Sequence, residues 1–192
     1  MIAGVVLAAG GASRFGSPKQ LADLDGVPLL QHAVDAPLAV AAIDRVVVVL
    51  GAEAERVREA VDLRSARPVV CAEWAEGMAA SLRCGVGAVG DCDWVIVTLG
   101  DQPRVTPQVI AAVMDEAAGA PVGTTAVRAT YGGVPGHPVA LGRAMLPRVA
   151  QLSGDVGARE LLGSATVRTF EAAGFCDPAD VDTPEELEAL RT

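Results

Sequence analysis

The sequence has no asparagine and only one lysine, Lys19, although 15 of its 192 residues are lysine or arginine. It also lacks positive charge overall, because 24 acidic residues give a formal net charge of −9. Sequence-independent nucleic-acid binding needs a basic face, so this charge argues against that class. Aromatic residues make up only 3% of the chain, so we expect Ala, Val and Leu to fill its core.

Long apolar runs are absent too, and no stretch approaches the length needed to span a membrane. The apolar start of the chain lacks the positively charged segment of a secretory signal peptide, so we expect a cytoplasmic protein with no membrane partner. The four cysteines form no C-x-x-C pair and do not cluster with the two histidines. We therefore expect small buried side chains at Cys71, Cys84, Cys92 and Cys176 rather than a thiolate metal site.

What the chain does contain is a regular alternation of strand and helix patterns. Continuous apolar runs predict strands buried on both faces at 2–8, 45–51, 67–72 and 93–100, with a further strand at 122–130. Helical spacing covers 28–42, 53–61, 77–89 and 107–118, with Pro37 expected to kink or interrupt the first. This order predicts an α/β fold, a single Rossmann-like domain over 1–192 with a mostly parallel sheet and helices on both faces.

After residue 130 the pattern loosens. The stretch "YGGVPGHP" at 131–138 predicts a turn-rich loop, and 153–162 predicts a loop that Asp155 caps into a helix. The stretch "VDTPEELEALR" predicts a helix, because Thr183 suits its N-cap and Pro184 its first position, and Glu186 stands three residues after the cap, as a capping box requires.

The loop after the first strand carries the only lysine. In parallel sheets, ligands collect at the carboxyl ends of strands, where this loop begins. Gly10 and Gly11 allow the backbone to approach a ligand, and successive N–H groups in such a turn form an anion-binding nest. Arg14 and Lys19 add two positive charges, so we expect a phosphorylated ligand. The Walker pattern and the dinucleotide pattern G-x-G-x-x-G are both missing.

The stretch L-A-A-G-x-x-x-R-x-G-x-x-K at 7–19 resembles the signature loop of the nucleotidyltransferases related to molybdenum cofactor cytidylyltransferase. Further motifs resemble this family in the same order: "GMAASL" at 77–82, "GDQP" at 100–103, "GHPVAL" at 136–141, "GDVGAR" at 154–159 and "DVDTPEEL" at 180–187. The resemblance implies the nucleotide-diphospho-sugar transferase type of fold. It also implies transfer of CMP from CTP to the phosphate of molybdopterin cofactor, with a client molybdoenzyme as a further partner.

Residue roles follow from the resemblance, position by position. Arg14, Lys19 and Asp101 would be catalytic, Asp101 and Asp182 would bind Mg²⁺, and the acceptor would contact His137, Asp155 and Arg159. Nucleotide contacts would come from the first loop, the "GMAASL" segment and the "GDQP" turn, namely Leu7, Ala8, Ala9, Gly10, Gly11, Gly77, Ser81 and Gly100. The chain departs from the family at Ala12, Phe15 and Glu73, where Ser, Met and Asn are often found.

The residues themselves leave alternatives open. Asp182 and Asp155 could be helix caps, and Arg159 could belong to a surface ion pair. A lone Asp after a strand is often a cap as well, but the next helix is expected only near Thr106, so capping explains Asp101 poorly. Lysine suits position 19 because its compact charge can follow a moving pyrophosphate, although coding bias alone could also have left it there.

Three further functions compete with cytidylyl transfer to molybdopterin. The acceptor could be a sugar or alcohol phosphate, or the donor could be GTP in a guanylyl transfer, although L-A-A-G favours CTP within the family. Some relatives are assigned as NAD(P)H oxidoreductases, but "RVVVVLGAEAE" offers no clear acid for a ribose at the end of the second strand. A binding module without catalysis would not need Lys19, Asp101 and Asp182 together.

Overall fold

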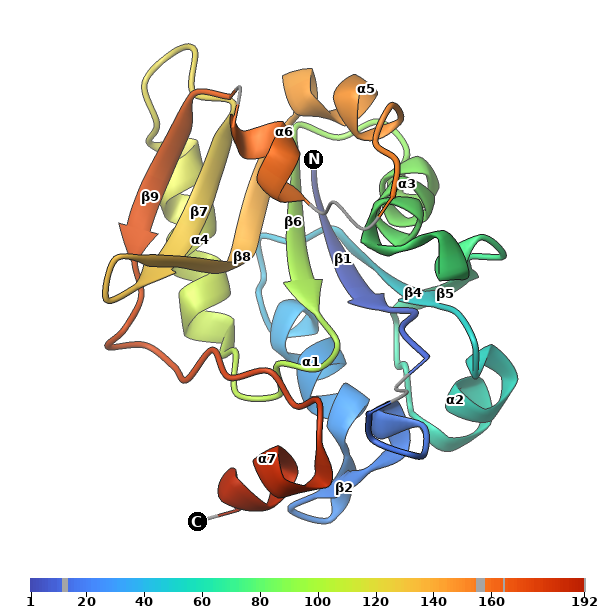
Figure 1. Cartoon of the computed structure of the whole chain (residues 1–192). Helices are drawn as coiled ribbons and strands as arrows, with labels where there is room; N and C mark the ends of the chain where they lie inside the picture. Colours follow the sequence, from blue (N-terminus) through green and yellow to red (C-terminus); the bar gives the residue numbers. More distant parts are fainter. Residues whose placement is uncertain (12–13, 155–157, 164, 192) are drawn as a thin grey trace.

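A seven-stranded sheet forms the centre of the protein in the computed structural model, which describes all residues except 12–13, 155–157, 164 and 192. The strand order is β5-β4-β1-β6-β8-β7-β9 (Figure 1). Among these seven strands, β8 alone runs antiparallel to its neighbours. The strands are β1 Ile2–Ala8, β4 Arg45–Leu50, β5 Arg67–Val70, β6 Trp94–Leu99, β7 Ala126–Tyr131, β8 Val134–Gly142 and β9 Val167–Glu171, and a separate hairpin pairs β2 Asp23–Leu24 with β3 Val27–Pro28.

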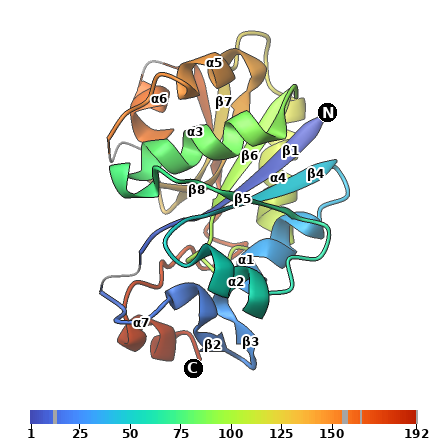
Figure 2. The same ribbon diagram turned by 90° about the vertical axis from the view of Figure 1, so that its right-hand side faces the viewer.

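Helices cover both faces of the sheet, as the sequence predicts (Figure 2). Alternate residues of the central strands point to opposite sides, so β1 places Val5 and Leu7 in one core cluster and Val6 and Ala8 in another. The first cluster packs against α3, α5 and α6, and the opposite face packs against α1, α2 and α4. The helices are α1 Leu29–Leu38, α2 Ala54–Ala60, α3 Met78–Val89, α4 Pro107–Ala118, α5 Leu146–Val149, α6 Ala158–Gly163 and α7 Pro184–Ala189, with short 3-10 turns η1 Lys19–Leu21, η2 Trp74–Glu76 and η3 Arg143–Met145.

The predicted βα alternation up to residue 118 is confirmed, with two corrections. The segment at 67–72 was expected to be buried on both faces, but β5 is an edge strand whose two ends are exposed. The first helix ends at Leu38 rather than at residue 42, because Pro37 lies in its last turn. Proline has no N–H to donate to the carbonyl four residues earlier, and its ring crowds that carbonyl, so it weakens a helix beyond the first turn. None of the described helices is long and apolar enough to cross a membrane.

The prediction of a loop at 131–138 is wrong. Tyr131 pairs with Val134, so Gly132 and Gly133 form a two-residue turn and the chain returns as β8. Both glycines have positive φ, 59° and 80°, which matches the turn geometry that suits a tight hairpin. Strand β8 pairs with β6 on one side and with β7 on the other, so it joins β7 and β9 to the rest of the sheet.

Candidate active site

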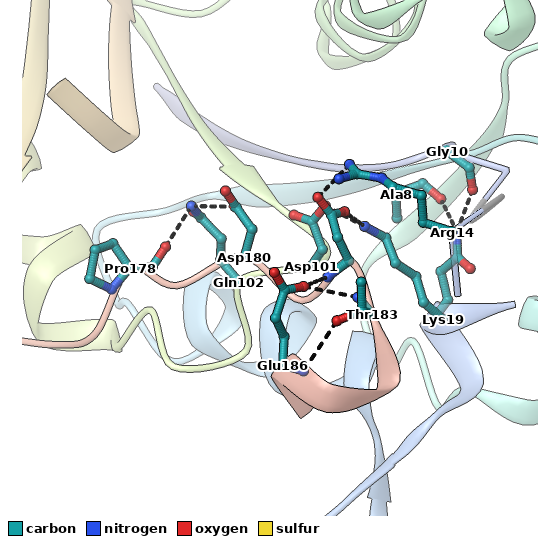
Figure 3. A network of polar contacts seen from close by, with 12 residues as sticks. Ala8, Gly10, Arg14, Lys19, Asp101, Gln102, Pro178, Asp180, Thr183 and Glu186 are labelled. Atoms are coloured by element: carbon teal, nitrogen blue, oxygen red, sulfur yellow. Dashed lines mark hydrogen bonds and ion pairs between the residues drawn. The ribbon is translucent and has the colours of Figure 1, made fainter. Parts of the chain in front are cut away.

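Four charged side chains from three distant segments meet at the carboxyl edge of the sheet (Figure 3). Lys19 Nζ donates to Asp101 Oδ2 at 2.8 Å and to Asp182 Oδ1 at 2.7 Å. Arg14 donates to the other oxygen of Asp182, Oδ2, at 2.6 Å. Asp101 and Asp182, although far apart in the chain, thus share the Lys19 ammonium as a hydrogen-bond donor.

Asp101 is positioned by β6 and by the segment before α7. Asp101 lies two residues after Leu99, the last residue of β6, and its backbone carbonyl accepts a hydrogen bond of 2.9 Å from the Val181 N–H. The neighbouring Gln102 is 5% exposed, and its Nε2 donates to Pro178 O and to Asp180 Oδ1, both at 2.9 Å. Gln102 therefore ties the Asp101 turn to the C-terminal segment, which Figure 1 shows running along this edge of the sheet to α7.

Asp182 is positioned by the start of α7. The predicted capping box is present: Thr183 Oγ1 accepts from the Glu186 N–H, and Glu186 Oε2 accepts from the N–H groups of Thr183 and Asp182. Since Thr183 caps the helix, the interpretation of Asp182 as the cap is wrong. Its carboxylate instead faces Lys19 and Arg14.

The first loop is held from beneath by Gln20. This side chain is 5% exposed, and its Nε2 donates to Ala8 O at 3.1 Å and to Gly10 O at 2.9 Å. Phe15, where the family often has Met, packs at the edge of an apolar cluster that includes Val181 and Leu187 of the C-terminal segment. The loop and the C-terminal segment therefore share an apolar contact as well as the charged one.

The pKa values of Lys19 and of the neighbouring carboxylates reflect their mutual attraction and their burial. Burial works against the charged form of Lys19, but attraction and hydrogen bonds from Asp101 and Asp182 outweigh it and raise the pKa of the amine. The hydrogen bond from Lys19 lowers the pKa of Asp182. Burial and the charge of Asp101 raise the pKa of the neighbouring Asp180. At neutral pH Lys19 is thus a cation held between carboxylates.

A cavity of about 270 Å³ lies beside this cluster and contains most of the predicted nucleotide contacts. Its wall includes Asp101 and an indole, Trp74, which the sequence analysis did not single out. Glu73, the acidic departure from the family, is exposed and does not belong to this wall. The residues lining the cavity are Leu7, Ala9, Gly10, Trp74, Ala75, Gly77, Met78, Ser81, Leu99 and Asp101.

The remaining predicted nucleotide contacts, Ala8, Gly11 and Gly100, do not line the cavity. Ala8 is 7% exposed, and a Cβ added at Gly100 would lie 2.8 Å from the Ala8 Cβ, so glycine at 100 lets these two strand ends approach closely. A Cβ at Gly11 would lie 3.1 Å from the ring of Trp74. Ala8 and Gly100 therefore lie against each other, and Gly11 lies against the indole of the cavity wall.

The carboxylates fit a hard divalent cation. Asp101 Oδ1 is buried and has no hydrogen-bond partner among the described residues, which leaves an anionic oxygen available for a ligand. Within those same residues, no group of three or more His, Cys, Asp or Glu side chains is arranged to hold a metal ion. Two carboxylates suit Mg²⁺, which usually takes one or two protein carboxylates and completes its shell with phosphates and water.

The predicted acceptor contacts are only partly described. Asp155 lies outside the described residues, as does the side chain of Arg159, whose backbone belongs to α6. His137 lies in strand β8, not in a loop as expected. Because Val97 of β6 pairs with Val139, His137 lies level with the carboxyl end of β6, on the edge that carries Asp101.

His137 is neutral at physiological pH. Burial, with a contribution from the Arg128 guanidinium, lowers its pKa to about 4. A neutral imidazole can form a hydrogen bond with an acceptor molecule, but it offers a phosphate no positive charge.

This low pKa predicts a loss of stability in mild acid. The unfolded chain binds a proton at His137 below about pH 6.5, whereas the folded chain binds it only near pH 4. The free energy of unfolding is therefore unaffected by protonation of His137 above about pH 6.5. It falls by at most about 3 kcal/mol as the pH decreases from 6.5 to 4. Urea unfolding of His137→Gln should therefore show a smaller drop between these pH values than the wild type. An equal loss of stability in the variant and the wild type would show that His137 is not the group with the lowered pKa.

Comparison with known proteins agrees with this geometry. A family model described as "MobA-like NTP transferase domain" matches residues 4–169. Rv0371c from Mycobacterium tuberculosis H37Rv has a structure with a TM-score of 0.87 and 34% identity, covering 99% of this chain and 97% of its own. A complex of Rv0371c with manganese has a TM-score of 0.81 and 32% identity, with coverage of 98% and 97%.

Two curated relatives differ in activity. Nicotine blue oxidoreductase from Paenarthrobacter nicotinovorans is 31% identical over 200 residues, which cover 98% of this chain and 96% of the relative. 2-C-methyl-D-erythritol 4-phosphate cytidylyltransferase from Rubrobacter xylanophilus is 37% identical over 116 residues, 57% of this chain and 48% of the relative. The family model covers most of the chain, so the protein belongs to the MobA-like nucleotidyltransferase family.

Proposed function

We propose that the protein transfers CMP from CTP to the phosphate of molybdopterin cofactor and releases pyrophosphate. The observation that carries this proposal is the meeting of Lys19, Asp101 and Asp182 beside a cavity that the L-A-A-G loop lines. The manganese complex of Rv0371c supports a divalent cation in the family, and the cytidylyltransferase relative supports CTP. The expected compartment is the cytoplasm, and a client molybdoenzyme would receive the product.

Each part of the donor has a matching part of the site. The cavity, with Trp74 and Ser81 in its wall, would hold the cytosine and its ribose. The backbone N–H groups of the first loop, with Arg14 and Lys19, would hold the triphosphate. Asp101 and Asp182 would hold Mg²⁺, which when bound supplies positive charge to the phosphates.

The chemical step needs positioning more than proton transfer. An oxygen of the acceptor phosphate forms a bond to the α-phosphorus of CTP, and the bond from that phosphorus to the bridging oxygen breaks. The electron pair leaves with pyrophosphate. Because the second pKa of a phosphate monoester is about 6, the nucleophile is already mostly ionised at neutral pH and needs no general base. The neutral His137 agrees with this requirement.

The test is pyrophosphate release with Mg²⁺, molybdopterin cofactor and each nucleoside triphosphate in turn. A sugar phosphate and an alcohol phosphate serve as competing acceptors. Pyrophosphate release only with the combination of CTP and molybdopterin cofactor would support the proposal. Release only with another acceptor would keep nucleotidyl transfer but reject molybdopterin.

Nucleotide choice gives a separate prediction. Because the loop reads L-A-A-G, CTP should bind at least about tenfold more tightly than GTP, a difference of about 1.4 kcal/mol. Calorimetric titration of both nucleotides measures this ratio. Ala9→Gly converts the loop to the L-A-G-G form and should reduce the ratio. Equal or tighter binding of GTP by the wild type would reject the preference for CTP.

An oxidoreductase is the second candidate, favoured by the full-length similarity to nicotine blue oxidoreductase. That activity would consume NADH or NADPH, so the nicotinamide absorbance in the presence of an aromatic acceptor dye tests it directly. Oxidation that survives Asp101→Asn and needs no divalent cation would favour this candidate over nucleotidyl transfer.

A further inference from the structure

Lys19 occupies the place between the two carboxylates that a divalent cation would need. Its Nζ lies 2.8 Å from Asp101 Oδ2 and 2.7 Å from Asp182 Oδ1, and its side chain is only 12% exposed. Both carboxylates are themselves partly buried, with side-chain exposures of 27% and 29%. The amine is therefore an internal counter-ion for the pair.

A cation and the amine cannot use these oxygens together. Mg²⁺ and Mn²⁺ bind carboxylate oxygens directly, and Mg²⁺ does so at about 2.0–2.1 Å, closer than the amine approaches them. A cation bridging the two oxygens would lie where Nζ lies, and two adjacent positive centres would repel each other. A cation that bridges Asp101 Oδ2 and Asp182 Oδ1 therefore requires Lys19 to move.

We propose that Lys19 competes with the divalent cation for Asp101 and Asp182 in the free protein, and that it moves to the phosphates when cation and nucleotide bind together. This inference rests on the metal and nucleotide site of the proposed function. It assigns Lys19 a regulatory role at that site: the free protein binds the cation weakly, and the nucleotide removes the competitor.

The surroundings of Lys19 permit such a movement. An ammonium on a four-carbon stem can change partners without moving its backbone. The backbone is fixed by η1, where the N–H groups of Leu21 and Ala22 donate to Pro18 O and Lys19 O, and by the hydrogen bonds of Gln20 to the loop. Arg14 contacts the other oxygen of Asp182, so it can remain in place.

The only lysine of the chain gives a direct assay. Acetylation by an N-hydroxysuccinimide ester, followed by mass spectrometry, reports the exposure of the Lys19 amine. The amine of Met1, paired with Asp93 at 2.6 Å, is a reference in the same sample. Saturating Mn²⁺ without nucleotide should raise the Lys19 rate about fivefold or more, and adding CTP should restore protection. The Met1 rate should stay constant.

A second measurement tests the competition itself. Lys19→Met removes the charge but keeps the length of the side chain, so Mn²⁺ without nucleotide should bind about tenfold more tightly, measured by electron paramagnetic resonance. Arg143→Met is the matched control, because Arg143 also bridges two carboxylates, Asp91 and Asp93, in a separate part of the structure. Its effect on Mn²⁺ affinity should be less than about twofold.

Neither measurement requires an acceptor or turnover. Both therefore test the competition even if the protein does not catalyse the proposed reaction. Mn²⁺ that binds equally to wild type and Lys19→Met would overturn the competition. Bound Mn²⁺ that leaves the acetylation rate of Lys19 unchanged would overturn the movement, even if removing the charge raised the affinity. Absence of Mn²⁺ binding to either protein would overturn the inference as a whole.

Discussion

Asp101→Asn is expected to lower the rate of pyrophosphate release by two or more orders of magnitude, the scale of losing one well-placed electrostatic group. The asparagine keeps the size and polarity of the side chain but removes the charge that would help hold Mg²⁺ beside the triphosphate. The backbone carbonyl of Asp101 still accepts from Val181, so the turn should keep its place. The melting temperature should therefore change little.

Asp182→Asn should have a similar effect, since the capping box of α7 uses Thr183 and Glu186 and not the Asp182 carboxylate. The loss of activity in the double variant should be much smaller than the sum of the two single losses in activation free energy, because both residues would bind the same ion. Asp91→Asn is the matched control: it removes a carboxylate paired with an arginine at an exposed site, and it should keep wild-type turnover. If Asp182→Asn lowers the melting temperature but keeps turnover, its role is structural.

Much of the fold follows from the sequence because its apolar patterns are local. The central strands carry continuous valine runs, and the start of α7 carries a complete capping box in four consecutive positions. The hairpins were missed although each has a local signal. Asp25-Gly26 and Gly132-Gly133 form their turns with positive φ at both residues. Such pairs are typical of two-residue hairpins.

The supports of the site could not be predicted in the same way. Gln20 and Gln102 each follow a charged residue of the cluster, and each is a buried amide that donates to backbone carbonyls of another turn or segment. Which carbonyl such an amide meets depends on long-range packing, which no local pattern encodes. The charged residues themselves have local signals, because Arg14 and Lys19 flank a glycine-rich loop and the segments of Asp101 and Asp182 resemble motifs of a known family.

Gly51→Ala is expected to disturb both sides of the cavity at once. Gly51 follows β4, and a Cβ there would lie 2.2 Å from Ala9 O and 2.8 Å from Trp74 Cγ. Such contacts do not occur between unstrained atoms, so the first loop or the indole must shift. Overpacking of this kind costs about 1–3 kcal/mol, and a displaced Ala9 or Trp74 changes the wall that would hold the nucleotide.

The measurements are a thermal melt and a calorimetric titration with CTP. The melting temperature should fall by about 2–4 °C for each kcal/mol lost, and the affinity for CTP should fall by about tenfold. Gly87→Ala is the matched control, because Gly87 is exposed in α3 and a Cβ there meets nothing within 4 Å. Alanine favours a helix interior by about 0.8–1.0 kcal/mol, so this variant should melt higher and bind CTP normally. If Gly51→Ala also binds CTP normally, the close approach of β4, the first loop and Trp74 does not shape the nucleotide site.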